Sequence, residues 1–197
     1  MAVDQLHDDP DWATLDGQAK RERLLLAAAE VFVREGLDAP MPAVAAAAGA
    51  GVASVYRQFP SKHDLLAELV MVRLDRITEA AALARTREGD RWSALTEMLW
   101  TLVERQSCDD FLGEALSAVD DSPAVIAALE RATGGLEELL ADTRAEGRLR
   151  ADATTLDLRL LFASTRAAKR VDPKAWRRML ALMIDALDTQ AVGRSAP

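Results

Sequence analysis

The fold is decided by residues 44–62, VAAAAGAGVASVYRQFPSK. The stretch begins with apolar residues at helical spacing, because Val44, Ala45 and Ala48 fall on one face of a helix. A Gly-Ala-Gly sequence at 49–51 then interrupts this pattern. Glycine adopts positive φ without a Cβ clash, so the interruption predicts the corner between two short helices.

A second helical pattern follows the glycine corner. Val52, Val55 and Phe59 recur at helical spacing and are expected to face inward. Pro60 ends this helix because the residue before a proline is disfavoured in α geometry. Ser61 is then a good N-cap for the next helix. Three polar side chains are left on or near the outer side of the second pattern: Ser54, Tyr56 and Arg57.

The segment from Arg23 to Leu66 resembles the DNA-binding domain of the tetracycline-repressor (TetR) family of one-component bacterial regulators. The residues that carry the resemblance are Leu24-Leu25, Ala27-Ala28, Phe32, Gly36, Val44-Ala45, Ala48-Gly49-Ala50, Ser54-Val55-Tyr56, Phe59 and Ser61-Lys62. The resemblance implies an all-α fold with an N-terminal three-helix helix-turn-helix DNA-binding domain and a C-terminal helical ligand-binding and dimerisation domain. We therefore expect the DNA-binding domain over 18–64 and the second domain over 65–197. Residues 1–17 are acidic and irregular in sequence, so we expect a disordered acidic tail there.

The resemblance also implies which residues meet DNA. The hydroxyls of Ser54 and Tyr56 and the ammonium of Lys62 would contact phosphates, while Val52 and Ala53 would lie against base edges. Arg57 would pair with a phosphate or a guanine edge. The full set of candidate DNA-binding residues is Arg21, Gly51, Val52, Ala53, Ser54, Tyr56, Arg57 and Lys62. Simpler interpretations remain open: a half-buried core tyrosine at 56, an exposed helix-start lysine at 62 and a solvated arginine at 21.

The segment departs from the family pattern at three positions: Ala50 stands for a valine, Ala53 for a glycine and Gly51 for a serine cap. These departures bear on the target sequence more than on DNA binding itself. Two of them, Ala50 and Ala53, together with the acidic composition, motivate an alternative function as a helical ligand-carrier or protein-interaction module with weakened DNA binding.

The composition bounds the class of protein. The chain has 197 residues, is 50% hydrophobic and only 5% aromatic, and carries a net charge of −8. Residues 18–62 hold six basic and four acidic residues, which gives that segment a net charge of +2. A small cationic segment on an acidic chain suits a protein that touches DNA with one face. No signal peptide, membrane-spanning run or disulfide framework is present in the sequence, so we expect a cytoplasmic protein without a membrane partner.

Apolar periodicity predicts helices throughout the chain. The expected ranges are 18–35, a helix beginning at Pro40 or Met41, then 52–59, 62–85, 91–106, a short helix near 111–116, 123–146, 154–170 and 173–188. The family resemblance favours a pocket for a small, largely apolar effector among some of the aromatic and aliphatic residues, whereas simple core packing is the commoner meaning. The candidate pocket residues are Trp92, Met98, Leu99, Trp100, Val103, Phe111 and Phe162.

The last two expected helices carry extensive apolar faces. Packing within the chain would explain these faces, and a homodimer built as a four-helix bundle, as the family resemblance implies, would explain them equally. The candidate dimer-interface residues are Leu158, Leu161, Thr165, Trp176, Met179, Leu180, Met183 and Leu187. Two copies would read a palindromic operator in double-stranded DNA.

The sequence contains no constellation for catalysis. It has no glycine-rich phosphate loop, no CxxC motif and no metal-ligand spacing, and neither of its histidines, His7 and His63, belongs to a recognisable triad. We therefore predict that the chain is not an enzyme and needs no metal or cofactor. The sequence favours a ligand-responsive transcriptional regulator, most simply a repressor that a small effector releases from its operator.

Overall fold

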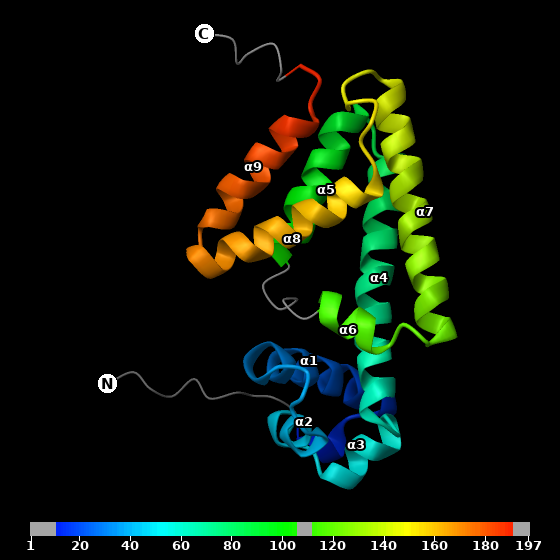
Figure 1. The fold of residues 1–197 in the computed structure, drawn as a ribbon. Coiled ribbons are helices and arrows are strands. Elements are labelled where there is room, and N and C mark those ends of the chain that lie inside the picture. The colour runs from blue at the N-terminus through cyan, green and yellow to red at the C-terminus, as the bar shows by residue number, and fades with distance from the viewer. Residues whose placement is uncertain (1–10, 106–111, 191–197) are drawn as a thin grey trace. The chain divides into compact units, whose positions relative to one another are not determined.

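The computed structural model describes residues 11–105 and 112–190. Over these residues the regular structure is almost entirely helical, with a single isolated β-bridge between Leu149 and Asp188 (Figure 1). The elements are the 3-10 helix η1 (Trp12–Thr14) and the α-helices α1 (Gly17–Glu35), α2 (Met41–Ala47), α3 (Val52–Gln58), α4 (Lys62–Thr86), α5 (Arg91–Arg105), α6 (Leu112–Ala118), α7 (Pro123–Ala145), α8 (Thr155–Val171) and α9 (Ala175–Leu187). The all-α prediction is confirmed, and the helix ends lie close to those expected.

The chain forms two compact units. The first unit contains α1, α2, α3, the start of α4 up to Leu69, and α6. The second unit contains α4 from Val70 onward together with α5, α7, α8 and α9. The compact units divide between Leu69 and Val70, inside α4, so this helix contributes residues to both units. The expected domain boundary between residues 64 and 65 stays a prediction.

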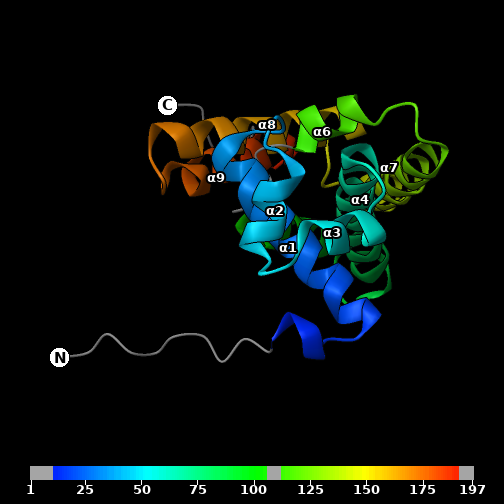
Figure 2. The same ribbon diagram turned by 90° about the horizontal axis from the view of Figure 1, so that it is seen from below.

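The first unit has a small apolar core made by three consecutive helices. The α1 helix packs against α2, and α2 packs against α3 (Figure 2). The side chains of Phe32, Val44 and Val55 are fully enclosed there. The α1 helix is rich in leucine and alanine, which are strong helix formers, and it ends at Gly36, whose φ of 81° only glycine adopts readily.

The N-terminal side of α1 differs from the expected acidic tail. Residues 11–16 contain η1, and the Asp16 carboxylate accepts a hydrogen bond from the backbone N–H of Ala19 at 2.8 Å. Asp16 is therefore the N-cap of α1. Its negative charge also interacts favourably with the positive end of the helix dipole. The predicted tail over 1–17 is wrong for residues 11–17; residues 1–10 lie outside the described part.

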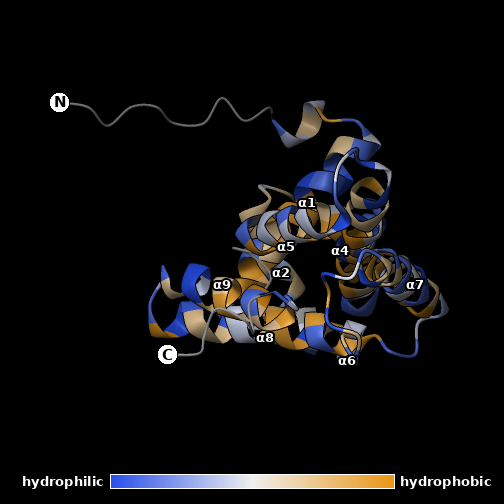
Figure 3. Cartoon of the chain, turned by 90° about the horizontal axis from the view of Figure 1, so that it is seen from above, coloured by the Kyte–Doolittle hydropathy of each residue, from blue (hydrophilic) through white to orange (hydrophobic). Residues whose placement is uncertain are grey.

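The second unit is held by one extended apolar cluster. Leu95, Leu99, Leu139 and Leu180 lie within it at 2% exposure or less, and they come from α5, α7 and α9. The α8 and α9 helices form an antiparallel pair with hydrophobic and hydrophilic residues on each (Figure 3). Amphipathic helices of this kind bury one side and leave the other in water.

Candidate nucleic-acid interface

The corner between α2 and α3 depends on one glycine. Gly49 has a φ of 65°, and the next residue, Ala50, donates its N–H to the carbonyl of Ala45 at 2.9 Å. This bond closes the end of α2 in the manner of a glycine C-cap. Gly51, in contrast, has an ordinary extended conformation with a φ of −73°, and it serves as the N-cap of α3 without a side chain to accept a hydrogen bond. The sequence-based prediction of a glycine corner therefore holds through Gly49.

The α3 helix has one buried side and one exposed side. Val55 and Phe59 are buried at 0% and 1% exposure, as expected. Ala53, Tyr56 and Arg57 are exposed on the opposite side. An exposed short helix after a glycine corner is the arrangement that a recognition helix needs to enter the major groove.

Val52 does not face inward. Its side chain is 42% exposed, because it opens α3 directly after the exposed residue Gly51, at the end of the helix that the rest of the unit leaves uncovered. The prediction that Val52 packs inward is wrong. Its exposure agrees instead with the position that the family resemblance implies, against the edges of the bases.

Two of the predicted DNA-binding side chains contact each other. Arg57 donates from Nη2 to the Ser54 hydroxyl oxygen at 2.8 Å, one helical turn earlier on α3. The hydroxyl accepts in this bond, so its own O–H remains able to donate to a phosphate oxygen. The pair places a cation and a hydroxyl donor side by side on the exposed side of α3.

The start of α4 is built by a reciprocal cap. The N–H of Asp64 donates to the Ser61 hydroxyl at 3.1 Å, and the N–H of Ser61 donates to the Asp64 carboxylate at 3.0 Å. This is the capping-box geometry, and it confirms Ser61 as the predicted N-cap. Lys62 follows immediately, and its ammonium lies 5.8 Å from the ring centroid of Phe32, which places this cation next to α1.

Arg21 lies beside α3 but is engaged within the protein. Its guanidinium donates to the carbonyl of Gln58 at 3.1 Å and pairs with the Glu68 carboxylate at 3.1 Å. It also lies 4.4 Å from the ring centroid of Phe59. The sequence placed Arg21 among solvated or phosphate-binding arginines and did not reveal these partners, because Glu68 is 47 residues away along the chain.

Arg23 is a basic residue near the corner that the candidate set left out. A Cβ built on Gly49 would lie 3.5 Å from Arg23 Nη2, so this guanidinium lies directly against the turn. The only sequence signal for it is its place, two residues after Arg21, in the basic start of α1.

The predicted pocket residues of the second unit come together in its apolar cluster. Trp92, Met98, Leu99 and Val103 are buried, and Trp100 and Phe162 pack against them while partly exposed. The Trp100 ring centroid lies 6.0 Å from that of Trp176. Phe111 lies outside the described residues. The pocket stays a prediction; a hollow of about 450 Å³ in this unit is lined by different residues: Glu137, Glu138, Leu140, Ala141, Arg144, Ala153, Thr154 and Thr155.

Most of the predicted dimer-interface side chains are covered inside one chain. The buried ones are Leu158, Leu161, Thr165, Trp176, Leu180 and Leu187. Met179 and Met183 are partly buried. These faces are covered because α8 and α9 pack against each other and against the same cluster as α5. Of the two interpretations of these faces, packing within the chain accounts for the six buried residues, and their part in a dimer interface stays a prediction.

Metal-binding clusters and membrane-spanning helices are both absent from residues 11–105 and 112–190. No group of histidine, cysteine, aspartate and glutamate side chains there could hold a metal ion. Over the same ranges, no helix combines the length and apolarity that crossing a membrane requires.

A unit with a glycine-cornered helix pair and an exposed recognition helix, followed in one chain by an all-helical unit, defines a helical DNA-binding regulator. Residues 24–69 match the family model described as "Bacterial regulatory proteins, tetR family". A TetR transcription regulatory protein from Mycobacterium vanbaalenii is 30% identical, with 86% of this chain and 95% of that chain covered and a TM-score of 0.59. The chain belongs to the TetR family of bacterial transcription regulators.

Other solved structures share the fold. A TetR transcriptional regulator from Streptomyces coelicolor is 26% identical, with 85% of this chain and 98% of that chain covered and a TM-score of 0.63. The TetR-like regulator LfrR from Mycobacterium smegmatis, solved in complex with proflavine, is 21% identical, with coverage of 85% and 93% and a TM-score of 0.68. The comparison with curated proteins found no match.

Proposed function

We propose that this chain is a cytoplasmic repressor rather than an enzyme. It binds a palindromic operator as a homodimer and is released by a small, largely apolar effector. The observation that carries the proposal is the exposed side of α3, where Val52 and Tyr56 are 42% and 46% exposed while Val55 on the opposite side is fully buried. An apolar and an aromatic residue that stay this exposed at the open face of a short helix suit contact with a groove.

The chemistry of this face separates affinity from specificity. The Tyr56 and Ser54 hydroxyls and the Lys62 ammonium are donors suited to phosphate oxygens. Val52 and Ala53 offer only methyl groups, which discriminate thymine from the other bases through its C5-methyl group. Arg57, held by Ser54 at 2.8 Å, is the residue of the set that can make a bidentate bond to guanine.

A homodimer follows from the small size of the reading surface. One seven-residue helix contacts few base pairs, so two copies on half-sites about 34–36 Å apart are needed for a selective operator. Leu156 and Leu160 are 56% and 51% exposed, one turn apart on α8, and Leu182 on α9 is 46% exposed. These three leucines and Val171, the last residue of α8, which is 87% exposed, are available to a second copy, whereas the buried residues of the same helices are not.

The effector site is proposed within the apolar cluster around α5. Trp92, Met98 and Trp100 there offer an aromatic and polarisable surface suited to a flat apolar ligand. The structurally similar regulator from M. smegmatis was solved in complex with proflavine, a flat aromatic molecule, and we propose that the effector of this chain is likewise flat, although less polar. Such an effector must bind the form released from DNA more tightly than the DNA-bound form, since otherwise it shifts no equilibrium.

The DNA-binding proposal is tested by fluorescence anisotropy with duplexes covering the gene's own promoter region and with duplexes selected from random sequence. Tyr56→Phe and Lys62→Ala should weaken binding to all duplexes by similar factors, because phosphate contacts carry no sequence information. Lys174→Ala, at an exposed lysine of the second unit, is the matched control and should bind as wild type. Binding that is absent for every duplex would leave the alternative of a ligand carrier or protein-interaction module.

The dimer proposal needs its own measurement. Leu160→Glu should convert a dimer to a monomer in sedimentation or light scattering, because it places a charge in an apolar interface. Leu129→Glu on α7, where the leucine is 38% exposed, is the control and should leave the mass unchanged. A wild-type protein that is monomeric at every concentration contradicts this part of the proposal.

A further inference from the structure

Arg21 makes contacts in the first unit that its sequence context does not suggest. Its Nη1 donates to the backbone carbonyl of Gln58 at 3.1 Å. Its Nε and Nη2 reach the two carboxylate oxygens of Glu68 at 3.3 and 3.1 Å. The face of the guanidinium lies 4.4 Å from the ring centroid of Phe59. The Arg21 side chain on α1 therefore contacts Gln58, the last residue of α3, and Phe59, the C-cap of α3. It also contacts Glu68 in the first part of α4.

Each contact meets a structural need of the recognition helix. Gln58 is the last residue of α3, so its carbonyl has no partner further along the helix and needs a donor from elsewhere. Phe59 is 1% exposed and anchors the end of α3 in the core, and an arginine over its ring adds a cation–π contact. Glu68 holds the guanidinium in a two-pronged, charge-assisted geometry that only arginine offers.

We propose that Arg21 and Glu68 form a positioning pair that sets the orientation of α3, and that Arg21 is not a phosphate ligand. The proposal rests on the DNA-binding function proposed above. The Arg21 side chain is only 34% exposed and that of Glu68 only 25% exposed. The Glu68 carboxylate, 3.1 Å from Arg21 Nη2, balances the charge of the guanidinium. Moving Arg21 to a phosphate would break both Glu68 bonds and the Gln58 bond, and it would leave a half-buried carboxylate without its cation.

The two roles of Arg21 make opposite predictions for Glu68. If Arg21 binds phosphate, Glu68→Gln frees the cation, and DNA affinity rises. If Arg21 positions α3, Glu68→Gln loosens the guanidinium, and DNA affinity falls. The salt dependence separates them as well, since each lost phosphate contact lowers the slope of log K against log salt by about 0.9.

The experiment compares Arg21→Gln, Arg21→Lys, Glu68→Gln and the Arg21→Gln/Glu68→Gln double variant with wild type, by anisotropy over a salt series on the selected operator. We expect each variant to bind roughly tenfold more weakly, the scale of one lost charge-assisted hydrogen bond, with an unchanged salt slope. The double variant should be no weaker than the weaker single variant, because both changes remove one shared interaction. Glu79→Gln, at an exposed glutamate further along α4, is the control and should match wild type.

Any of three outcomes would overturn the proposed positioning role of Arg21 and Glu68. These are a higher DNA affinity for Glu68→Gln, a salt slope reduced by about 0.9 in Arg21→Gln, and wild-type binding by Arg21→Lys, whose ammonium keeps the charge but lacks the two-pronged guanidinium geometry.

Amide hydrogen exchange tests the same role without DNA. In Glu68→Gln, the Phe59 N–H, bonded to the Val55 carbonyl at 2.8 Å, should exchange faster, while the Ala48 N–H at the end of α2 should exchange as in wild type. If Arg21→Gln does not fold, Glu68→Gln decides alone. If wild type binds no duplex, the proposed function fails and the exchange result still decides the pair.

Discussion

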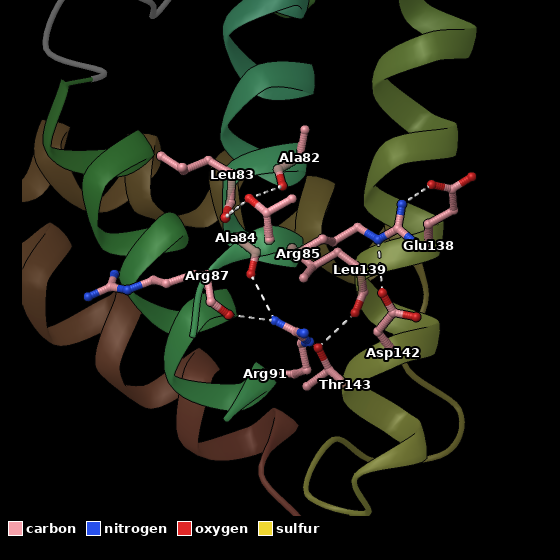
Figure 4. A network of polar contacts seen from close by, with 11 residues as sticks. Ala82, Leu83, Ala84, Arg85, Arg87, Arg91, Glu138, Leu139, Asp142 and Thr143 are labelled. Carbon is pink, nitrogen blue, oxygen red and sulfur yellow. Dashed lines mark hydrogen bonds and ion pairs between the residues drawn. The ribbon is translucent and has the colours of Figure 1, made fainter. Parts of the chain in front are cut away.

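Arg85 on α4 donates from Nε to the carboxylate of Asp142 on α7 at 2.8 Å (Figure 4). The same guanidinium also pairs with Glu138, one turn earlier on α7. A second pair joins these helices further along, where Arg131 contacts Asp75 at 3.0 Å. All of these side chains are at least one-third exposed, so the ion pairs lie at the solvent side of the two helices.

Arg85→Gln tests how much these surface pairs contribute to stability. Exposed ion pairs are weak and are screened by salt, whose Debye length falls to about 3 Å at 1 M. We expect a slightly lower Tm for Arg85→Gln at low salt and the same Tm as wild type near 1 M salt, by circular dichroism melting. Arg76→Gln, at an exposed arginine of α4, should show no such difference. A Tm gap that persists at high salt would show that the pair does not act as a screened surface contact.

Val52 and Val55 give a matched comparison within one helix. Val55→Ala removes two methyl groups from a fully buried site and should cost on the order of 1–2 kcal/mol of unfolding free energy, because a cavity is left in the core. Val52→Ala, at a 42% exposed site, should leave denaturant unfolding nearly unchanged. It should instead reduce the preference for thymine at one operator position in a selection from random duplexes. Equal losses of stability in the two variants would show that Val52 is part of the core.

Gly36 and Gly134 should respond oppositely to alanine. Gly36 has a φ of 81°, which a Cβ makes unfavourable, so Gly36→Ala should lower stability by about 1 kcal/mol. Gly134 lies inside α7, where a Cβ would meet nothing within 4 Å. Gly134→Ala should therefore raise stability by roughly 0.5–1 kcal/mol and raise Tm by a few degrees. A destabilised Gly134→Ala variant would mean that α7 needs its glycine for a bend or a close contact.

Asp90 predicts a pH dependence at the start of α5. Its pKa is lowered from 3.8, mainly by hydrogen bonding from the side chain of Ser93 and then from its backbone N–H, which donates at 2.8 Å. Because the folded-state pKa lies below the unfolded value, the carboxylate stabilises the fold above about pH 4, and this contribution is lost as pH falls through the folded pKa. Asp90→Asn should be less stable than wild type at neutral pH, with the gap closing in strong acid, by chemical denaturation over pH. A gap that is constant with pH would mean that the charge plays no part.

Local sequence patterns were sufficient for the helices, the glycine corner and the capping serine. Gly49, Pro60 and Ser61 act on their immediate neighbours through φ, a missing N–H and a side-chain acceptor, so their effect can be predicted without knowing the rest of the fold. The inward position of Val55 follows from helical spacing for the same reason. Val52, one turn earlier, has the same spacing but is exposed. Helical spacing therefore does not show which residues of an apolar face are covered by the neighbouring helices.

The tertiary structure decided which surfaces are free. Periodicity identifies the apolar side of α8 and α9, but only packing shows that Leu158, Leu161 and Leu180 are covered by their own chain, and that Leu160 is not. Likewise, the sequence around Arg21 in α1 gives no sign of an ion-pair partner, and only the folded structure places Glu68 of α4 beside it. Burial and pairing depend on contacts between residues distant in sequence, and a local pattern carries no information about those contacts.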